Sequence, residues 1–256
     1  MVATAGDSCT RNCMSSVGAT LVVLVRPATQ TMFSDEIRER SGTVMEKRAS
    51  RNPLEGLEIG ALHASETGEA LGVISRGMRD NPIHVAAFGD DPERQARRLH
   101  RLFEGAFAAM PMSRHMLAAR DDDGGILGVC GMFQPGDCQI SPEQQPDIEP
   151  YVLENGPEAA ECTMRWLGTW AQHDPEERHW HLGPVAVDAH LQGIGIGSRL
   201  MRIFCARMDA AGEDAYLETD KPINVRFYER FGFEVVGEEE VLGATNWFML
   251  RRAGRR

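Results

Sequence analysis

Regular patterns of apolar and polar residues begin near residue 57, and the fifty residues before it show no sustained period. Alternation over residues 57–62 predicts a short strand. A helix capped by Ser65 or Thr67 is expected to continue to about residue 79, because its apolar residues fall on one face. The pair Asn81-Pro82 is expected to end that helix.

The middle of the chain alternates between helical and strand patterns. Asp91-Pro92 places a capping residue before a proline, which is typical of a helix start. Two apolar runs, 116–119 and 126–133, flank Asp123-Gly124 and predict a hairpin. Residues 135–156 hold four prolines and predict a long loop that faces the substrate, and residues 157–172 predict a further helix.

The last third has the most regular pattern. A strand, a long amphipathic helix, a second strand and a second helix follow one another, and two strands close the chain. The expected ranges are 180–187, 195–211, 215–218, 222–231, 234–240 and 247–250. This order predicts a mixed α/β (α+β) fold with one strand–helix–strand unit in its middle.

The balance of charge argues against two classes of partner. The 256 residues hold 27 basic and 38 acidic side chains, which gives a net charge of −11. Such a chain repels a phosphate backbone and an anionic membrane surface, so we expect neither a nucleic-acid nor a membrane partner. Residues 1–50 carry six basic and five acidic side chains (+1), and residues 51–256 carry 21 and 33 (−12). A cationic or amine substrate suits the acidic part.

The sequence predicts neither a metal site nor a membrane span. The six cysteines include no CxxC pair, and the closest two, Cys9 and Cys13, lack a neighbouring cluster of metal ligands. The longest apolar run, Val17–Val25, is shorter than the ~18–20 residues that a membrane span needs, and no clean signal-cleavage site follows it. We therefore interpret this run as a strand or a packed extension, and we expect a cytoplasmic protein without a metal.

A glycine-rich turn carries the clearest chemical signal. Gly193, Gly195 and Gly197 lie between an expected strand and the long helix. Glycine lets the backbone approach a ligand closely, and free amides at a helix start bind anions, so a pyrophosphate is the natural guest. The lysine of a P-loop is missing, and Ser198 and Leu200 stand where the dinucleotide fingerprint needs glycine. By itself the turn is also compatible with a helix start that binds nothing.

The surroundings of this turn resemble the acyl-CoA-binding motif of the GNAT acetyltransferase superfamily. Gln192-x-x-Gly195-x-Gly197 follows a strand and precedes a helix, and LETDKPINVRFYERFGFEVV (217–236) looks like the next strand and helix of that family. Within the superfamily, the chain is most similar to puromycin-type N-acetyltransferases. The shared patterns are AF-x-x-x-P-x-x-R-H (106–115), QGxGxGS (192–198), LET…N-x-x-FYER-x-GF (217–233) and W-x-M-x-R (247–251).

The resemblance covers about residues 57–251 and implies a fold. The expected architecture is a GNAT-like mixed, mostly antiparallel sheet, with a splayed central parallel strand pair flanked by helices. Residues 56–256 are expected to form the N-acetyltransferase domain, and residues 1–55 an N-terminal extension.

The resemblance also implies acetyl-CoA as the co-substrate and assigns its contacts. The backbone of Val185, Ala186 and Val187 would pair with the pantetheine amides, and the turn would cradle the pyrophosphate. Asn224 and Tyr228, near the start of the following helix, would face the thioester sulfur. The residues of the turn are Gln192, Gly193, Ile194, Gly195, Ile196, Gly197 and Ser198.

The implied reaction is direct attack of a neutral amine on acetyl-CoA, without a covalent enzyme intermediate. Because the amine arrives mostly protonated, the reaction needs a base. His179 and His181 alternate on one face of a strand that points toward the site, and Glu218 ends the next strand, so all three are candidates for the base. Tyr228 is the candidate that stabilises the leaving thiolate.

The acceptor remains open between classes. A small-molecule amine is the leading interpretation, a protein amine (an N-terminus or a lysine) is the alternative, and a non-catalytic acyl-CoA-binding sensor is the third. The sequence shows no heptad pattern, so a monomer and a homodimer are both compatible with it.

Overall fold

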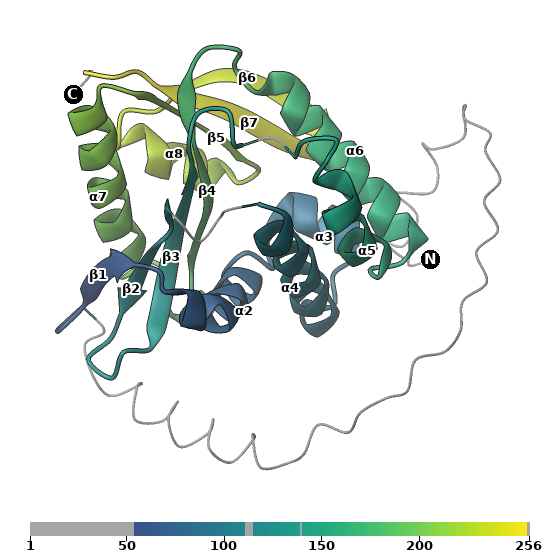
Figure 1. Ribbon diagram of the computed structural model, residues 1–256, viewed down its shortest axis with the longest axis horizontal. Coiled ribbons are helices and arrows are strands. Elements are labelled where there is room, and N and C mark those ends of the chain that lie inside the picture. The colour runs from purple at the N-terminus through teal and green to yellow at the C-terminus, as the bar shows by residue number, and fades with distance from the viewer. Residues whose placement is uncertain (1–53, 111–114, 139, 255–256) are drawn as a thin grey trace, which may run out of the picture.

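The computed structural model describes residues 54–110, 115–138 and 140–254, and a seven-stranded sheet crosses them (Figure 1). Neighbouring strands follow the order β1-β2-β3-β4-β5-β7-β6. Every neighbouring pair is antiparallel except β4 and β5, which are parallel. The strands are β1 (Glu58–Ala61), β2 (Leu117–Arg120), β3 (Ile126–Phe133), β4 (His179–Val187), β5 (Asp214–Thr219), β6 (Glu234–Val241) and β7 (Ala244–Arg251).

Helices cover both faces of this sheet (Figure 1). One face carries the 3-10 turn η1 (Ala64–Glu66) and the helices α2 (Thr67–Gly77), α3 (Pro82–Phe88), α4 (Pro92–Ala109), α5 (Gln145–Leu153) and α6 (Pro157–His173). The other face carries α7 (Ile196–Ala211) and α8 (Pro222–Glu229), and the 3-10 turn η3 (Ala189–Leu191) follows β4. In the part of the chain that the structure describes, no helix combines the length and the apolar character needed to cross a membrane.

Two apolar cores lie on the two faces because strand side chains alternate. On β2, Leu117 and Ala119 belong to the core under α7, whereas Ala118 belongs to the core under α2 and α4. Both cores contain fully buried large side chains, such as Ile74 on one face and Phe204 on the other. The inner strands β2 and β3 are therefore buried on both sides, whereas the edge strands β1 and β6 are largely exposed.

The two central strands diverge soon after they meet. β4 and β5 pair only at His179↔Asp214, Trp180↔Ala215 and His181↔Tyr216. Beyond this point β4 continues against β3, and β5 continues against β7. The expectation of a splayed parallel pair inside a mostly antiparallel sheet is confirmed.

The structure corrects the predicted elements in two places. Asn81-Pro82 does not only end a helix, because Pro82 begins α3, where its fixed φ suits the first helical position. The predicted loop 135–156 contains α5. Pro146 lies in the first turn of α5, where a missing amide costs little, and Ile148 and Val152 bury one face of the helix. The remaining predicted elements from residue 57 onward match the structure to within a few residues, and the predicted strand at 17–25 lies outside the described residues.

Candidate active site

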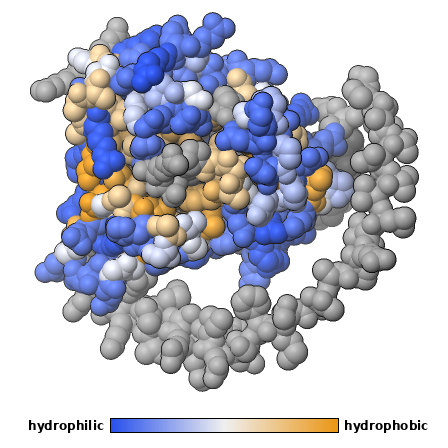
Figure 2. All heavy atoms as spheres, in the orientation of Figure 1, coloured by the Kyte–Doolittle hydropathy of each residue, from blue (hydrophilic) through white to orange (hydrophobic). Residues whose placement is uncertain are grey.

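A cavity of about 1070 Å³ opens where β4 and β5 diverge. Its walls come from these two strands, from the turn after β4, and from the helices α2, α3, α4, α5, α6 and α8. Figure 2 shows the molecule from the same side as Figure 1. Hydrophobic residues gather near the middle of this face and over the strands beside it, and hydrophilic residues surround them. Ligand pockets usually measure about 300–1,000 Å³, so this cavity has room for a large co-substrate and an acceptor.

One wall of the cavity is an unpaired strand edge. Val185, Ala186 and Val187 line the cavity, and their backbone pairs on the other side with Cys130, Val129 and Gly128 of β3. On the side that faces β5 no ladder forms, so peptide N–H and C=O groups are available to a ligand. This is the arrangement that the resemblance implies for pantetheine.

The glycine turn closes one end of the same cavity. Gly193 and Gly195 have φ of 81° and 108°, a region that favours glycine, and α7 begins directly after Gly195. Six of the seven predicted turn residues line the cavity, whereas Ile194 does not and is 39% exposed. The Gln192 side chain donates to the carbonyls of Gly77 and Val187 at 2.9 and 3.2 Å. Its amide therefore ties the turn to α2 and β4.

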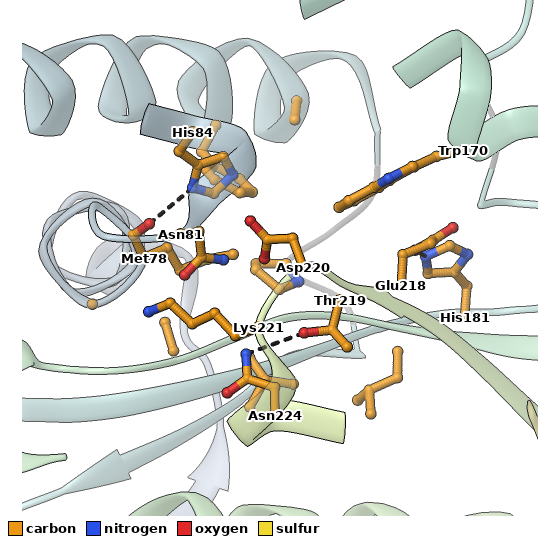
Figure 3. A pocket seen from close by; sticks show the side chains of 18 of the residues that line it. Met78, Asn81, His84, Trp170, His181, Glu218, Thr219, Asp220, Lys221 and Asn224 are labelled. Carbon is orange, nitrogen blue, oxygen red and sulfur yellow. Dashed lines mark hydrogen bonds and ion pairs between the residues drawn. The ribbon is translucent and has the colours of Figure 1, made fainter. Parts of the chain in front are cut away.

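Asn224 and Tyr228 both line the cavity, but only Asn224 lies near the start of α8. Its Nδ2 donates to Thr219 Oγ1 at 3.1 Å (Figure 3). Tyr228 is in the last turn of α8, so the expectation that it lies near the helix N-terminus is wrong. Burial raises the pKa of the Tyr228 phenol above its ordinary value, and Cys130 and Asp220 add to the rise. At neutral pH the hydroxyl therefore keeps its proton and is a hydrogen-bond donor.

Acidic and aromatic side chains, among them Glu218, Asp220 and Trp170, line another part of the cavity (Figure 3). Asp220 follows β5 directly, and its Oδ2 accepts the Ile83 amide at 2.7 Å. Asp80 pairs with Lys221 at 2.5 Å. The indole of Trp170 is fixed by a 2.9 Å hydrogen bond from Nε1 to Asn246 Oδ1. Asp220 and Trp170 are absent from the predicted site. The position of Asp220 after a strand of the split pair is the signal by which the sequence could have shown it.

Four polar side chains cluster beside the closed end of the split. His179 Nε2 and His181 Nδ1 lie 3.2 and 3.4 Å from Asp174 Oδ1, and Cys138 Sγ donates to Asp174 Oδ2 at 3.4 Å. Burial opposes charge on His179, but its contacts with Asp174 and Cys138 raise its pKa to about 10. Burial also opposes ionisation of Cys138, yet contacts with the two histidines lower the pKa of its thiol. The four side chains thus form one tightly coupled polar group.

The structure separates the three candidates for the base. His181 Nε2 lies 3.0 Å from Glu218 Oε2, and both side chains line the cavity. Since an ionised carboxylate only accepts, the hydrogen between them belongs to His181 Nε2. His179 is 5% exposed and lies outside the cavity lining, with Nδ1 directed at the Glu177 carbonyl at 2.7 Å. Of the three, Glu218 and His181 are therefore the two that an acceptor in the cavity can reach.

Comparison with known families identifies the class of this protein. Residues 79–233, more than half of the chain, match the model of the Acetyltransferase (GNAT) family. The chain belongs to this family, and it is an acetyltransferase.

Solved structures with this fold support the same architecture. A structure described as histone acetyltransferase HPA2 and related acetyltransferase from Corynebacterium glutamicum is 21% identical, with a TM-score of 0.57 over 78% of this chain and 98% of that one. Arylalkylamine N-acetyltransferase 2 from Aedes aegypti is 13% identical, with a TM-score of 0.53 over 77% and 98%. The polyamine N-acetyltransferase of Drosophila melanogaster is 12% identical, with a TM-score of 0.53 over 77% and 99%. At these identities the likeness concerns the fold.

Replacing Gly195 with valine is expected to weaken CoA binding by about 10–100-fold, the value of one lost charge-assisted hydrogen bond to phosphate. A β-branched residue is strained at φ 108°, and relaxing that strain moves the amides that precede α7. Calorimetric titration of the folded variant with CoA measures the effect. Gly124→Val is the matched control, because Gly124 also has a positive φ, of 82°, but lies in the β2–β3 turn. Unchanged affinity in folded Gly195→Val would remove the turn from the binding site.

Proposed function

We propose that this protein is an acetyl-CoA-dependent N-acetyltransferase that acetylates the amine of a small molecule. One observation carries the proposal: a single cavity is lined both by the split between β4 and β5 with its glycine turn and by a compartment of carboxylates and indole rings. The first part suits a long, phosphate-bearing co-substrate, and the second suits a cationic amine.

The proposed place of acetyl-CoA follows the split. The backbone of Val185, Ala186 and Val187 pairs with the pantetheine amides. The pantetheine thereby takes the place beside β4 that β5 leaves empty after the strands diverge. The pyrophosphate lies against the turn 192–198, where the amides at the start of α7 point toward an anion. Asn224, held by Thr219, lies between this arm and the acceptor compartment.

The proposed place of the amine is beside Glu218, Asp220 and Trp170. Carboxylates attract an ammonium group, and the face of an indole ring stabilises a nearby cation by about 0.5–2 kcal/mol. Apolar side chains of α4 and α5, including Phe103 and Ile148, line the adjoining wall and suit a hydrocarbon or aromatic body. The arylalkylamine and polyamine N-acetyltransferases with this fold act, by their names, on amines of this general class.

In the proposed reaction, the amine nitrogen forms a bond to the acetyl carbon, and the carbon–sulfur bond of acetyl-CoA breaks. The proton of the amine passes to Glu218, directly or through a water, while His181 Nε2–H holds the other carboxylate oxygen. A backbone amide of the split strand stabilises the oxyanion. The electron pair of the broken bond remains on the CoA sulfur, to which the Tyr228 hydroxyl donates a hydrogen bond.

Finer aspects of the proposal rest on the sequence resemblance. We propose that the chain is of the puromycin type, that residues 56–256 form the catalytic domain, and that the protein works in the cytoplasm as a monomer or a homodimer. The shared patterns at 192–198, 217–233 and 247–251 support the subgroup, and the position of six of the seven residues 192–198 in the cavity wall agrees with it.

Release of free CoA thiol tests the proposed function. Full-length protein is incubated with acetyl-CoA and a panel of arylalkylamines, polyamines, aminonucleosides and a lysine-containing basic peptide, and thiol is followed with a chromogenic disulfide. We expect amine-dependent, multiple-turnover release with at least one small amine and formation of the N-acetyl product by mass spectrometry. Turnover with the peptide alone would favour a protein acetyltransferase, and CoA binding without turnover would favour a sensor.

A further inference from the structure

We propose that Cys138, Asp174, His179 and His181 form a binding site for a divalent transition-metal ion, for which Zn²⁺ is the best fit. Their ligand atoms all lie within 4.8 Å of one another. The residues come from three segments that the fold brings together: the chain before α5, the connection from α6 to β4, and the start of β4. This differs from the expectation of no metal, which considered only neighbours in sequence.

The spacing of the ligand atoms fits a tetrahedral site. With metal–ligand bonds of about 2.0–2.3 Å, adjacent ligand atoms of a tetrahedron are about 3.3–3.7 Å apart. Asp174 Oδ1 lies 3.2 Å from His179 Nε2 and 3.4 Å from His181 Nδ1. These two edges are close to the required length, and any of the other separations, which reach at most 4.8 Å, would shorten by about 1 Å or less when an ion binds.

The outer hydrogen bonds orient both histidines as metal ligands. His179 Nδ1 faces the carbonyl of Glu177 at 2.7 Å, and His181 Nε2 faces the carboxylate of Glu218 at 3.0 Å. Each of these nitrogens therefore keeps its hydrogen when an ion binds, and the other nitrogen gives up its proton to offer a lone pair to the metal. Those nitrogens, His179 Nε2 and His181 Nδ1, are buried close to Asp174 but make no hydrogen bond of good geometry with any described residue. Metal-bound histidines typically donate their second N–H to a carbonyl or a carboxylate in this way.

Charge and ligand type select the ion. A thiolate and a carboxylate bring two negative charges into a largely buried place, and one divalent cation neutralises both. Two imidazoles and a thiolate favour Zn²⁺ over Mg²⁺ or Ca²⁺, which prefer oxygen ligands. Cys138 and His181 also lie in the cavity wall, so the ion would fix the ring of His181 beside Glu218 in a positioning role.

Metal analysis of the full-length protein tests this site without relying on activity. The protein is purified without a chelator or a histidine tag, supplied with Zn²⁺, desalted and measured by plasma mass spectrometry. We expect about one zinc per chain. Replacement of the zinc by Co²⁺ is expected to give a thiolate-to-metal absorption band in the near ultraviolet. Cys138→Ser should abolish that band and weaken zinc binding by at least the ~10–100-fold that loss of an outer-shell partner costs.

Matched variants show where the ion lies. Cys205→Ser replaces a buried thiol outside this cluster and should keep both the zinc and the cobalt band. Circular dichroism checks the fold of each variant, and if Cys138→Ser is unfolded, His179→Gln takes its place. Wild-type protein that retains neither zinc nor cobalt would overturn the proposal, as would a folded Cys138→Ser that keeps the cobalt band. The proposed function is measured by release of CoA thiol and the metal site by metal content and the cobalt band, so either proposal can fail without the other.

Discussion

Glu218→Gln is expected to lower kcat by about 10²–10⁴-fold, the usual contribution of a general base. Glutamine keeps the shape of the side chain and a polar group beside His181, but an amide takes up no proton at neutral pH. The carboxylate lies at the point where β5 leaves β4, within the cavity wall, whereas the proposed contacts of CoA are with the backbone of β4 and with the glycine turn. The KM for acetyl-CoA should therefore remain close to the wild-type value.

Stopped-flow measurement of thiol release at saturating amine isolates the chemical step. Glu238→Gln is the matched control, because Glu238 is exposed on β6 and lies outside the cavity lining. A Glu218→Gln enzyme with an unchanged chemical rate would exclude Glu218 as the base.

Tyr228→Phe is expected to lower kcat by about 10²-fold while the affinity for acetyl-CoA is preserved. The phenol is buried and holds its proton, since burial raises its pKa. Full proton transfer to a CoA thiolate, whose conjugate acid has a pKa near ~8.5, is therefore unfavourable. The Tyr228 hydroxyl can still contribute a hydrogen bond to the sulfur, and replacement by phenylalanine removes only that bond.

The phenyl ring that Tyr228→Phe retains should preserve the packing against Phe227 and Phe233, so the melting temperature of the variant checks that the fold is intact. Tyr151→Phe removes a phenol hydroxyl on α5, outside the cavity lining, and should leave kcat unchanged. Wild-type kcat in Tyr228→Phe, under conditions where chemistry limits turnover, would contradict the role of the hydroxyl.

The strand and helix periods of the last third predicted a strand–helix–strand unit, and the resemblance to the GNAT superfamily implied that its two strands are splayed. Alternation places β4 and β5, and the glycines mark the start of α7, because each of these signals is local. The two missed helices show where local signals mislead. Proline in the first turn of α3 and α5 resembles a helix end or a loop when the packing that stabilises these short helices is unknown.

The residues of the candidate site also fall into two groups: those that a local motif reveals and those that only the fold brings together. Residues 192–198 of the glycine turn are contiguous, so a sequence motif reveals them. Asp220, Trp170 and the partners of His181 come from separate segments, and only the folded chain brings them together. Cys138 and Asp174 lie 36 positions apart in the sequence, so they form no short metal-binding motif. Sequence reasoning identified His181 and Glu218 as candidates, but not their contact with each other.

The three residue pairs between β4 and β5 also have a mechanical consequence. They join two half-sheets, β1-β2-β3-β4 and β5-β7-β6, at one end only. A change in the distance between β4 and β5 at the other end breaks no backbone hydrogen bond between the two half-sheets. The half-sheets can therefore pivot about the last paired residues, His181 and Tyr216. Accommodation of a thick or a thin ligand then costs bending of the strands and local repacking of the two cores, each of which contains residues of both half-sheets, rather than loss of sheet hydrogen bonds.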